Sequence, residues 1–189
     1  MKFKKSLTAF ILAAISSISL SQAELKFATI DMNKLFEGYH KTDAAQKEIN
    51  VERARVQKEN DERLAKIRDL ETDIKSLRKK LEDPTLGDKK KMELGKKFEE
   101  KRQEGIALDR ERREFLQRRN AALMEKTRQD MKIILDEINV VIEVAAKSDN
   151  YDYIFNKSAT GANQVPFLLF AKDAVDITDQ LSAKLNKSK

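Results

Sequence analysis

One break in an otherwise continuous helical pattern limits the fold of this chain more than any other feature. Residues 33 to about 148 have the pattern of charged helix, and this pattern stops only within LEDPTLGDKKKMEL. Pro84 cannot continue a helix because it lacks the backbone N–H and fixes φ. Gly87 permits a positive φ, and Asp88 can cap a second helix. The break therefore predicts a hairpin turn near residues 83–88, which joins two antiparallel arms.

Apolar residues on both sides of the break repeat at spacings of three, four or seven, the heptad pattern of a coiled coil. Before the break they are Ile67, Leu70, Ile74, Leu77 and Leu81, and after it they are Met124, Met131, Ile134, Ile138, Val141 and Ala145. The pattern predicts that the arms pack along these seams. The alternative is a pair of charged helices held by ion pairs such as Glu59–Arg63, each worth only about 0.2–0.5 kcal/mol.

Polar residues and glycines interrupt the seams. The first register, continued toward the N-terminus, places Arg53, Asn60 and Arg63 at seam positions. Gly95 and Gly105 lie inside the second arm, where each costs about 1 kcal/mol relative to alanine. We therefore expect arms that are tightly packed near the chain ends, on the second arm, and looser beyond.

The two ends of the chain have strand patterns. Strands are expected at residues 25–31, at 151–155 and at 165–171, where the continuous apolar run VPFLLFA predicts a buried strand. Asp31 or Asn33 can cap the helix that follows the first strand, and Asp176 can cap a last helix over residues 176–186.

These patterns predict an α+β fold in which a helical hairpin is inserted into a small sheet. Residues 24–41 and 148–189 are expected to form the head, with the antiparallel α-helical coiled-coil hairpin at residues 42–147. The composition agrees, because 37% charged and 6% aromatic residues are too polar for one round core of 189 residues.

The first 23 residues have the pattern of a secretory signal peptide. Basic residues at the start precede an apolar run over residues 7–20, and Ser21-Gln22-Ala23 is a small-x-small cleavage site. The apolar run is shorter than the ~20 residues that span a bilayer. We expect cleavage after Ala23 and an exported, soluble chain; the alternative is an uncleaved membrane anchor. The chain has no cysteine, which excludes disulfides.

The sequence argues against an enzyme. His40 is the single histidine, and without cysteines there is neither thiol catalysis nor a zinc–thiolate site. The lysines at residues 89–91 lack the glycines of a phosphate-binding loop. No metal or other cofactor is expected, and the acidic residues alternate with basic ones as on a solvated helix face.

Both ends of the chain resemble one family. FATIDMNKLFEGYHKT, residues 27–42, is similar to the opening strand and helix of the Skp/OmpH family of periplasmic chaperones. YDYIFNKSA (151–159), VPFLLFA and DITDQLSAKLN resemble its closing strands and last helix. Many relatives carry valine where Ile30 stands. The resemblance covers essentially all of the chain after the signal peptide, although the hairpin itself is generic.

The resemblance implies a homotrimer in which three hairpins surround a central cavity. It also implies ATP-independent binding of unfolded outer-membrane proteins, so that they do not aggregate before outer-membrane protein assembly. Heptad periodicity alone equally permits a dimer. Six residues are expected in the oligomerisation head: Phe27, Ile30, Ile154, Phe155, Phe167 and Leu169. For the apolar run that holds Phe167 and Leu169, the alternative is a core strand within one chain.

Scattered apolar residues on the arms suit weak contacts with many client sequences. The candidates for client binding are Leu64, Leu94, Phe98, Ile106, Phe115 and Leu116, and their alternative role is packing between helices. Lysines also gather near the turn: Lys79, Lys80, Lys89, Lys90, Lys91, Lys96 and Lys97. This basic tip is expected either to attract anionic lipid, lipopolysaccharide or acidic client segments, or to be a solvated loop.

Two other classes of function compete with a chaperone. A coiled-coil structural or adaptor protein of the cell envelope would have tight, continuous seams, which the polar seam positions disfavour. Nucleic-acid binding is disfavoured because aromatic residues are not interleaved with the basic ones, and because the chain carries a secretion signal.

Overall fold

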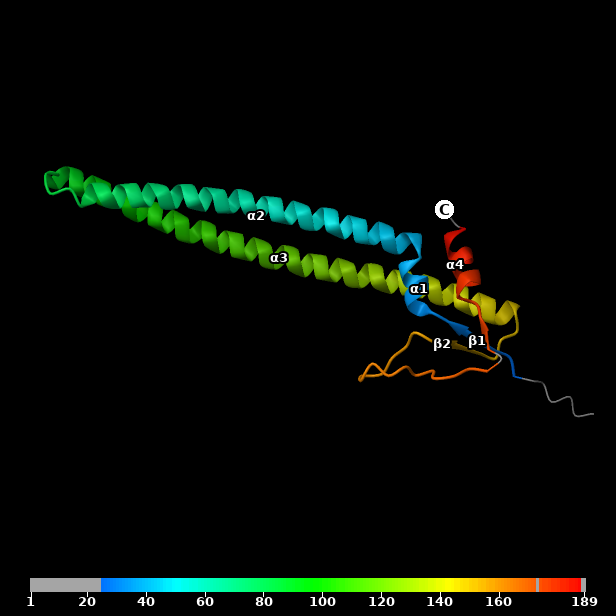
Figure 1. The fold of residues 1–189 in the computed structure, drawn as a ribbon. Coiled ribbons are helices and arrows are strands. Elements are labelled where there is room, and N and C mark those ends of the chain that lie inside the picture. The colour runs from blue at the N-terminus through cyan, green and yellow to red at the C-terminus, as the bar shows by residue number, and fades with distance from the viewer. Residues whose placement is uncertain (1–24, 173, 188–189) are drawn as a thin grey trace, which may run out of the picture.

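The computed structural model describes residues 25–172 and 174–187. The expected signal peptide and its cleavage site therefore lie outside the described residues. A long helical hairpin projects from a small head, which contains a three-stranded sheet and two short helices (Figure 1). The expected α+β class is confirmed.

The hairpin consists of α2, His40–Leu81, and α3, Asp88–Ser148. The turn between them contains Pro84 and Gly87. Asp83 accepts hydrogen bonds from the backbone N–H and the hydroxyl of Thr85, which fixes the turn. Gly87 has φ −67° and precedes α3 as its N-cap, so the positive φ that glycine permits is not used.

The head sheet is parallel, in the order β2-β1-β3. Strand β1, Phe27–Ile30, is central; β2, Tyr153–Asn156, and β3, Val175–Asp176, flank it. Helix α1, Met32–Glu37, follows β1, and Asp31 caps it by accepting from the backbone N–H of Lys34. Helix α4, Thr178–Asn186, closes the chain.

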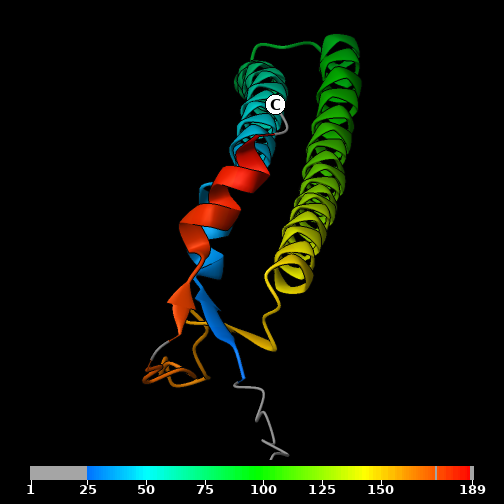
Figure 2. The ribbon, with the colours of Figure 1, turned by 90° about the vertical axis from the view of Figure 1, so that its right-hand side faces the viewer.

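The main core lies where the head meets the end of α3 (Figure 2). Helices α1 and α4 and strand β1 cover the last turns of α3. The apolar face of the last helix, α4, is buried in this core. The buried residues of this core are Ala28, Ile30, Leu35, Tyr39, Ile134, Ile138, Ala145, Ile177, Leu181 and Leu185.

The second seam differs from the prediction. Ile134, Ile138 and Ala145 pack in the head core rather than along a coiled coil, and Met124 and Met131 are exposed. The helix also breaks at Gly38 and Tyr39, so residues 33–148 form three helices instead of two.

The expected buried strand at residues 165–171 was wrong. This segment has only an isolated bridge between Thr160 and Pro166, and Phe167, Leu169 and Phe170 are 75–79% exposed. It lies on the far side of the sheet from α2 (Figures 1 and 2). The third strand is instead Val175–Asp176, and the N-cap position of α4 is Ile177. Asp176 still accepts from the backbone N–H of Thr178, the first residue of α4, over 2.9 Å.

Candidate binding surfaces

The first heptad seam packs the arms together in the part of the hairpin nearer the turn. Leu70 of α2 is buried there, and Ile67, Ile74, Leu77 and Leu81 are half-buried, as the first heptad seam predicts. A Cβ atom at Gly105 of α3 would lie 3.3 Å from Leu70 Cδ2. Gly105 therefore allows the two helices to approach, a role that the sequence pattern did not reveal.

A polar layer replaces the apolar seam in the middle of the hairpin. Asn60 is only 8% exposed, and Arg112 Nη1 donates to its Oδ1 over 3.4 Å. The Arg63 guanidinium lies 3.9 Å from the centre of the Phe115 ring, and Arg119 lies 5.7 Å from the same ring. The expected polar seam positions Asn60 and Arg63 thus do face the other arm, whereas Arg53 is exposed.

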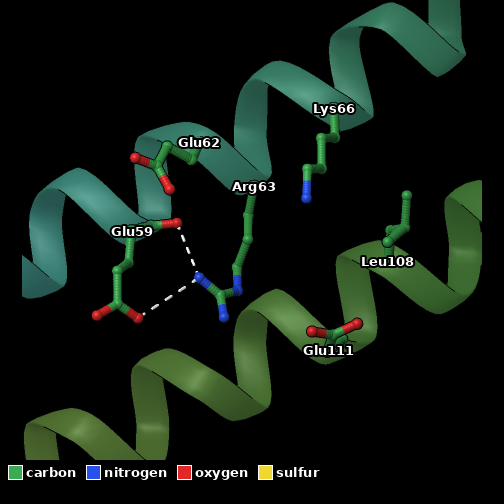
Figure 3. A pocket seen from close by; sticks show the side chains of 6 residues that line it. All are labelled: Glu59, Glu62, Arg63, Lys66, Leu108 and Glu111. Carbon is green, nitrogen blue, oxygen red and sulfur yellow. Dashed lines mark hydrogen bonds and ion pairs between the residues drawn. The ribbon is translucent and has the colours of Figure 1, made fainter.

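A shallow cleft opens beside this layer (Figure 3). Arg63 extends from α2 toward α3, and its Nη1 donates to the backbone oxygen of Glu59 over 2.9 Å. Its Nε is buried without a partner. The mixed acidic and basic lining does not favour one small ion, and the volume is about 370 Å³. The lining residues are Glu59, Glu62, Arg63, Lys66, Leu108 and Glu111.

Farther toward the head, ion pairs connect the arms. Lys126 of α3 pairs with Glu48 of α2 at 3.3 Å, and Arg119 pairs with Glu52 at 3.7 Å. These charged contacts occupy the level at which the second heptad seam was expected. Ile49 and Val56 of α2 are also buried in this stretch, so the contact between the arms there is part apolar and part charged.

The six candidate client-binding residues fall into three groups. Ile106 is 47% exposed, and Phe115 is 7% exposed between the arms. The other four, Leu64, Leu94, Phe98 and Leu116, are half-buried. Arg78 reaches over the Phe98 ring at 6.0 Å. In the single chain, five of the six side chains therefore keep some solvent-accessible apolar surface.

The seven lysines of the basic tip are all exposed. They lie on the last turns of α2 and the first turns of α3, on either side of the turn. Like charges placed this close raise the local positive potential. Two acidic residues lie among them: Asp83 in the turn and Asp88 at the start of α3.

The head carries an exposed aromatic surface. Phe27 stacks with Tyr153 and Phe155, with ring centroids 5.7 Å and 6.2 Å away. All three rings are exposed, as are Phe167 and Leu169 in the following segment. Of the predicted oligomerisation residues, Ile30 and Ile154 instead belong to or pack against the core of the single chain.

Sequence reasoning missed other exposed apolar residues. Ile133, Val140 and Val144 lie on α3 at spacings of seven and four, one position away from the buried row. Phe170 and Val175 add to the exposed head surface. Their spacing forms a second apolar row on α3, which the sequence analysis could have found. The neighbouring row that begins at Met124 was chosen instead.

Charged contacts attach β3 to the rest of the head. Burial raises the pKa of Asp176, but hydrogen bonds from Lys157 and Thr178 outweigh burial and lower it to about 2. Lys157 follows β2, and Thr178 also accepts from the backbone N–H of Asp31 over 2.9 Å. This network joins the carboxyl ends of all three strands.

Nothing in the described parts of the chain forms a centre for metal chemistry: no cluster of three or more His, Cys, Asp or Glu side chains has a geometry suited to an ion. Among the helices over residues 25–172 and 174–187, none combines the length and apolar character that a bilayer crossing requires.

The fold and its surfaces define a class of protein: a small α/β head that carries a long helical hairpin with charged faces and scattered apolar side chains. The family model described as outer membrane protein (OmpH-like) matches residues 26–185. The chain therefore belongs to the OmpH-like family, the Skp/OmpH family of periplasmic chaperones for outer-membrane proteins. A search among curated proteins found no match.

Proposed function

We propose that this protein is an ATP-independent periplasmic holdase, which binds unfolded outer-membrane proteins and prevents their aggregation. The observation that carries the proposal is the distribution of apolar surface on the hairpin. Ile106 is half-exposed, and Leu64, Leu94, Phe98 and Leu116 are half-buried, dispersed among charged residues over both arms. Many small contacts of this kind bind varied sequences weakly and release them.

Phe115 is not retained in the proposed contact set. Its ring is buried between the arms and covered by Arg63. In this account it sets the spacing of the arms, and the other five residues contact the client.

The proposed working form is a homotrimer. The stacked rings of Phe27, Tyr153 and Phe155 are exposed, and so are Phe167 and Leu169 in the segment that follows β2. Exposed apolar surface of this kind marks interaction sites. In a trimer the heads, residues 24–41 and 148–189, would cover it, and the hairpins, residues 42–147, would surround a cavity.

We also propose that the protein is exported to the periplasm and that its basic tip contacts an anionic surface there. Residues 1–23 would direct export and be removed after Ala23. The basic tip would contact anionic lipid headgroups or lipopolysaccharide, and this attraction would weaken with salt because the Debye length is only ~8 Å at physiological ionic strength.

To test the proposal, a urea-unfolded outer-membrane β-barrel protein is diluted into buffer with or without the purified chain of residues 24–189. Turbidity reports aggregation, and light scattering gives the mass of any soluble complex. We expect suppressed aggregation without ATP and a complex of one client with three chains. Unchanged aggregation by a well-folded protein would contradict the holdase proposal and favour a structural or adaptor protein of the envelope.

A further inference from the structure

The two arms join the head in different ways. Helix α3 enters the head core as one uninterrupted helix and ends at Ser148. Helix α2 instead begins after a two-residue break at Gly38 and Tyr39. The N-cap residue of α2, Tyr39, makes no side-chain capping hydrogen bond. Thr42 and Asp43 donate to the Tyr39 carbonyl oxygen. The N–H of His40, the first residue of α2, needs a partner from elsewhere, because the first N–H groups of a helix have no partner within it.

Asn186, at the end of α4, supplies that partner. Its Oδ1 accepts from the His40 backbone N–H over 3.0 Å and lies 3.0 Å from His40 Nδ1. Its Nδ2 donates to the carbonyl oxygens of Gly38 and Ser182, each over 3.0 Å. An asparagine amide has two donor positions and two acceptor positions. All four are used here, across the α1–α2 break and within α4.

We propose that Asn186 is a positioning residue that caps α2 from the C-terminal helix, and so fixes the base of the first arm on the head. A second contact supports the same joint: the Tyr39 hydroxyl donates to Glu137 Oε2 over 2.7 Å, and Lys41 Nζ lies 2.6 Å from Glu137 Oε1. The cap ties α2 to α4, whereas the Glu137 contacts tie it to α3.

The arrangement also fixes the proton on His40. Asn186 Nδ2 has two carbonyl acceptors, so the orientation of the amide is set and Oδ1 faces the imidazole. His40 Nδ1 must then carry the proton, and neutral His40 is the Nδ1–H tautomer. The imidazolium form donates from the same nitrogen, so protonation leaves this contact in place. Glu137, Lys41 and the Tyr39 ring are the other groups near this joint.

The test compares the full chain with Asn186→Ala and with Lys187→Ala, an exposed neighbour, as the control. Amide hydrogen exchange is followed at the first turn of α2, and ¹⁵N spectra report the His40 tautomer. His40 is the single histidine of the chain, so the imidazole signals belong to it without ambiguity. We expect Nδ1–H in the wild type and control, and loss of this preference in Asn186→Ala. Exchange over residues 40–43 should accelerate about fivefold in Asn186→Ala alone, the effect of one lost cap.

If Asn186→Ala unfolds the whole head, the His40 tautomer of the wild type still tests the inference. If it does not, a second background separates loss of the cap from other effects of the substitution. Proline at His40 removes the capped N–H, and it suits the first position of a helix. Tyr39 is extended, with φ −82° and ψ 124°, which is the geometry that a residue before proline prefers. In His40→Pro, Asn186→Ala should no longer change exchange over residues 41–43.

An Nε2–H tautomer in the wild type would overturn the inference. So would an equal acceleration by Asn186→Ala in the His40→Pro and wild-type backgrounds, since the asparagine would then act elsewhere. Neither readout uses a client, so the result is independent of the holdase proposal.

Discussion

The Arg63 guanidinium of α2 lies 3.9 Å from the centre of the Phe115 ring of α3, at the level where polar residues interrupt the apolar seam of the hairpin. The ring is buried, and the charge above it is held by Glu59. This pair joins the two arms at the point where heptad packing alone would not. It therefore makes the middle of the hairpin sensitive to single substitutions.

Removing the Phe115 ring should destabilise the hairpin. We expect Phe115→Ala to lower the free energy of unfolding by about 3 kcal/mol, because the ring is buried and the substitution leaves a cavity. Urea unfolding followed by circular dichroism measures this change. Arg113→Ala, on the exposed side of α3, is the matched control and should change it by less than about 0.5 kcal/mol.

The contribution of the Arg63–Phe115 pair itself is separable by a double-mutant cycle. Arg63→Ala, Phe115→Ala and the double variant should give a coupling free energy of about 0.5–1 kcal/mol, the range for a partly exposed cation–π contact. A coupling indistinguishable from zero would show that the two residues stabilise the hairpin independently.

The two glycines of α3 should respond differently to alanine. A methyl group at position 95 would meet only open space, so Gly95→Ala should stabilise the helix by about 1 kcal/mol. At Gly105 the same methyl group would lie 3.3 Å from Leu70 Cδ2, so Leu70 must move and the gain should be smaller or reversed. Thermal unfolding of the two variants tests the difference; equal gains would contradict the close approach at Gly105.

Acid should weaken the head through Asp176. Its pKa falls from 3.8 to about 2 on folding, because hydrogen bonds from Lys157 and Thr178 outweigh the effect of burial. A carboxyl group with a lowered folded pKa stabilises the fold fully above about pH 4 and loses that contribution as the pH falls through 2. The side chain is 44% exposed, so solvent screening limits the effect to about 1 kcal/mol.

The measurement for this prediction is the unfolding temperature of the wild type and of Asp176→Asn between pH 2 and 7. The wild type should be more stable at neutral pH, and the difference should disappear near pH 2. A difference that persists unchanged at pH 2 would mean that the charge of Asp176 is not its source.

The trimer proposal predicts that exposed head residues behave as interface residues. Phe167→Ser combined with Leu169→Ser should weaken self-association at least tenfold, as measured by sedimentation velocity. Val51→Ser is the control, since Val51 is 69% exposed on α2. If the head variant and the control associate equally, these two residues do not form the interface.

The sequence predicted the hairpin and the central strand well because their signals are local. Pro84 ends one helix whatever surrounds it, and Leu70 with its heptad neighbours needs only the other arm. Met131 fits the same heptad but is exposed, because a straight helix drifts against a 3.5-residue repeat and brings Lys126 toward α2 instead.

The prediction of a buried strand at residues 165–171 was wrong for a different reason. Its apolar run predicts burial, yet within one chain Phe167 and Leu169 have no covering element. Strand formation depends on a partner edge, which a periodicity argument does not supply. The caps show the same limit: Asp31 caps α1 from its own segment, whereas Asn186 reaches α2 from 146 residues away in the sequence.

Site-specific photo-crosslinking to an unfolded outer-membrane β-barrel shows whether the hairpin arms contact the client. The photoreactive residue replaces Ile106 or Leu94 on the arms in separate preparations, with Lys187 at the end of the head as the comparison position. We expect strong client crosslinks from both arm positions and weak ones from Lys187. Crosslinks confined to Lys187, or none from any position while the protein remains folded, would contradict the claim that the arms hold the client.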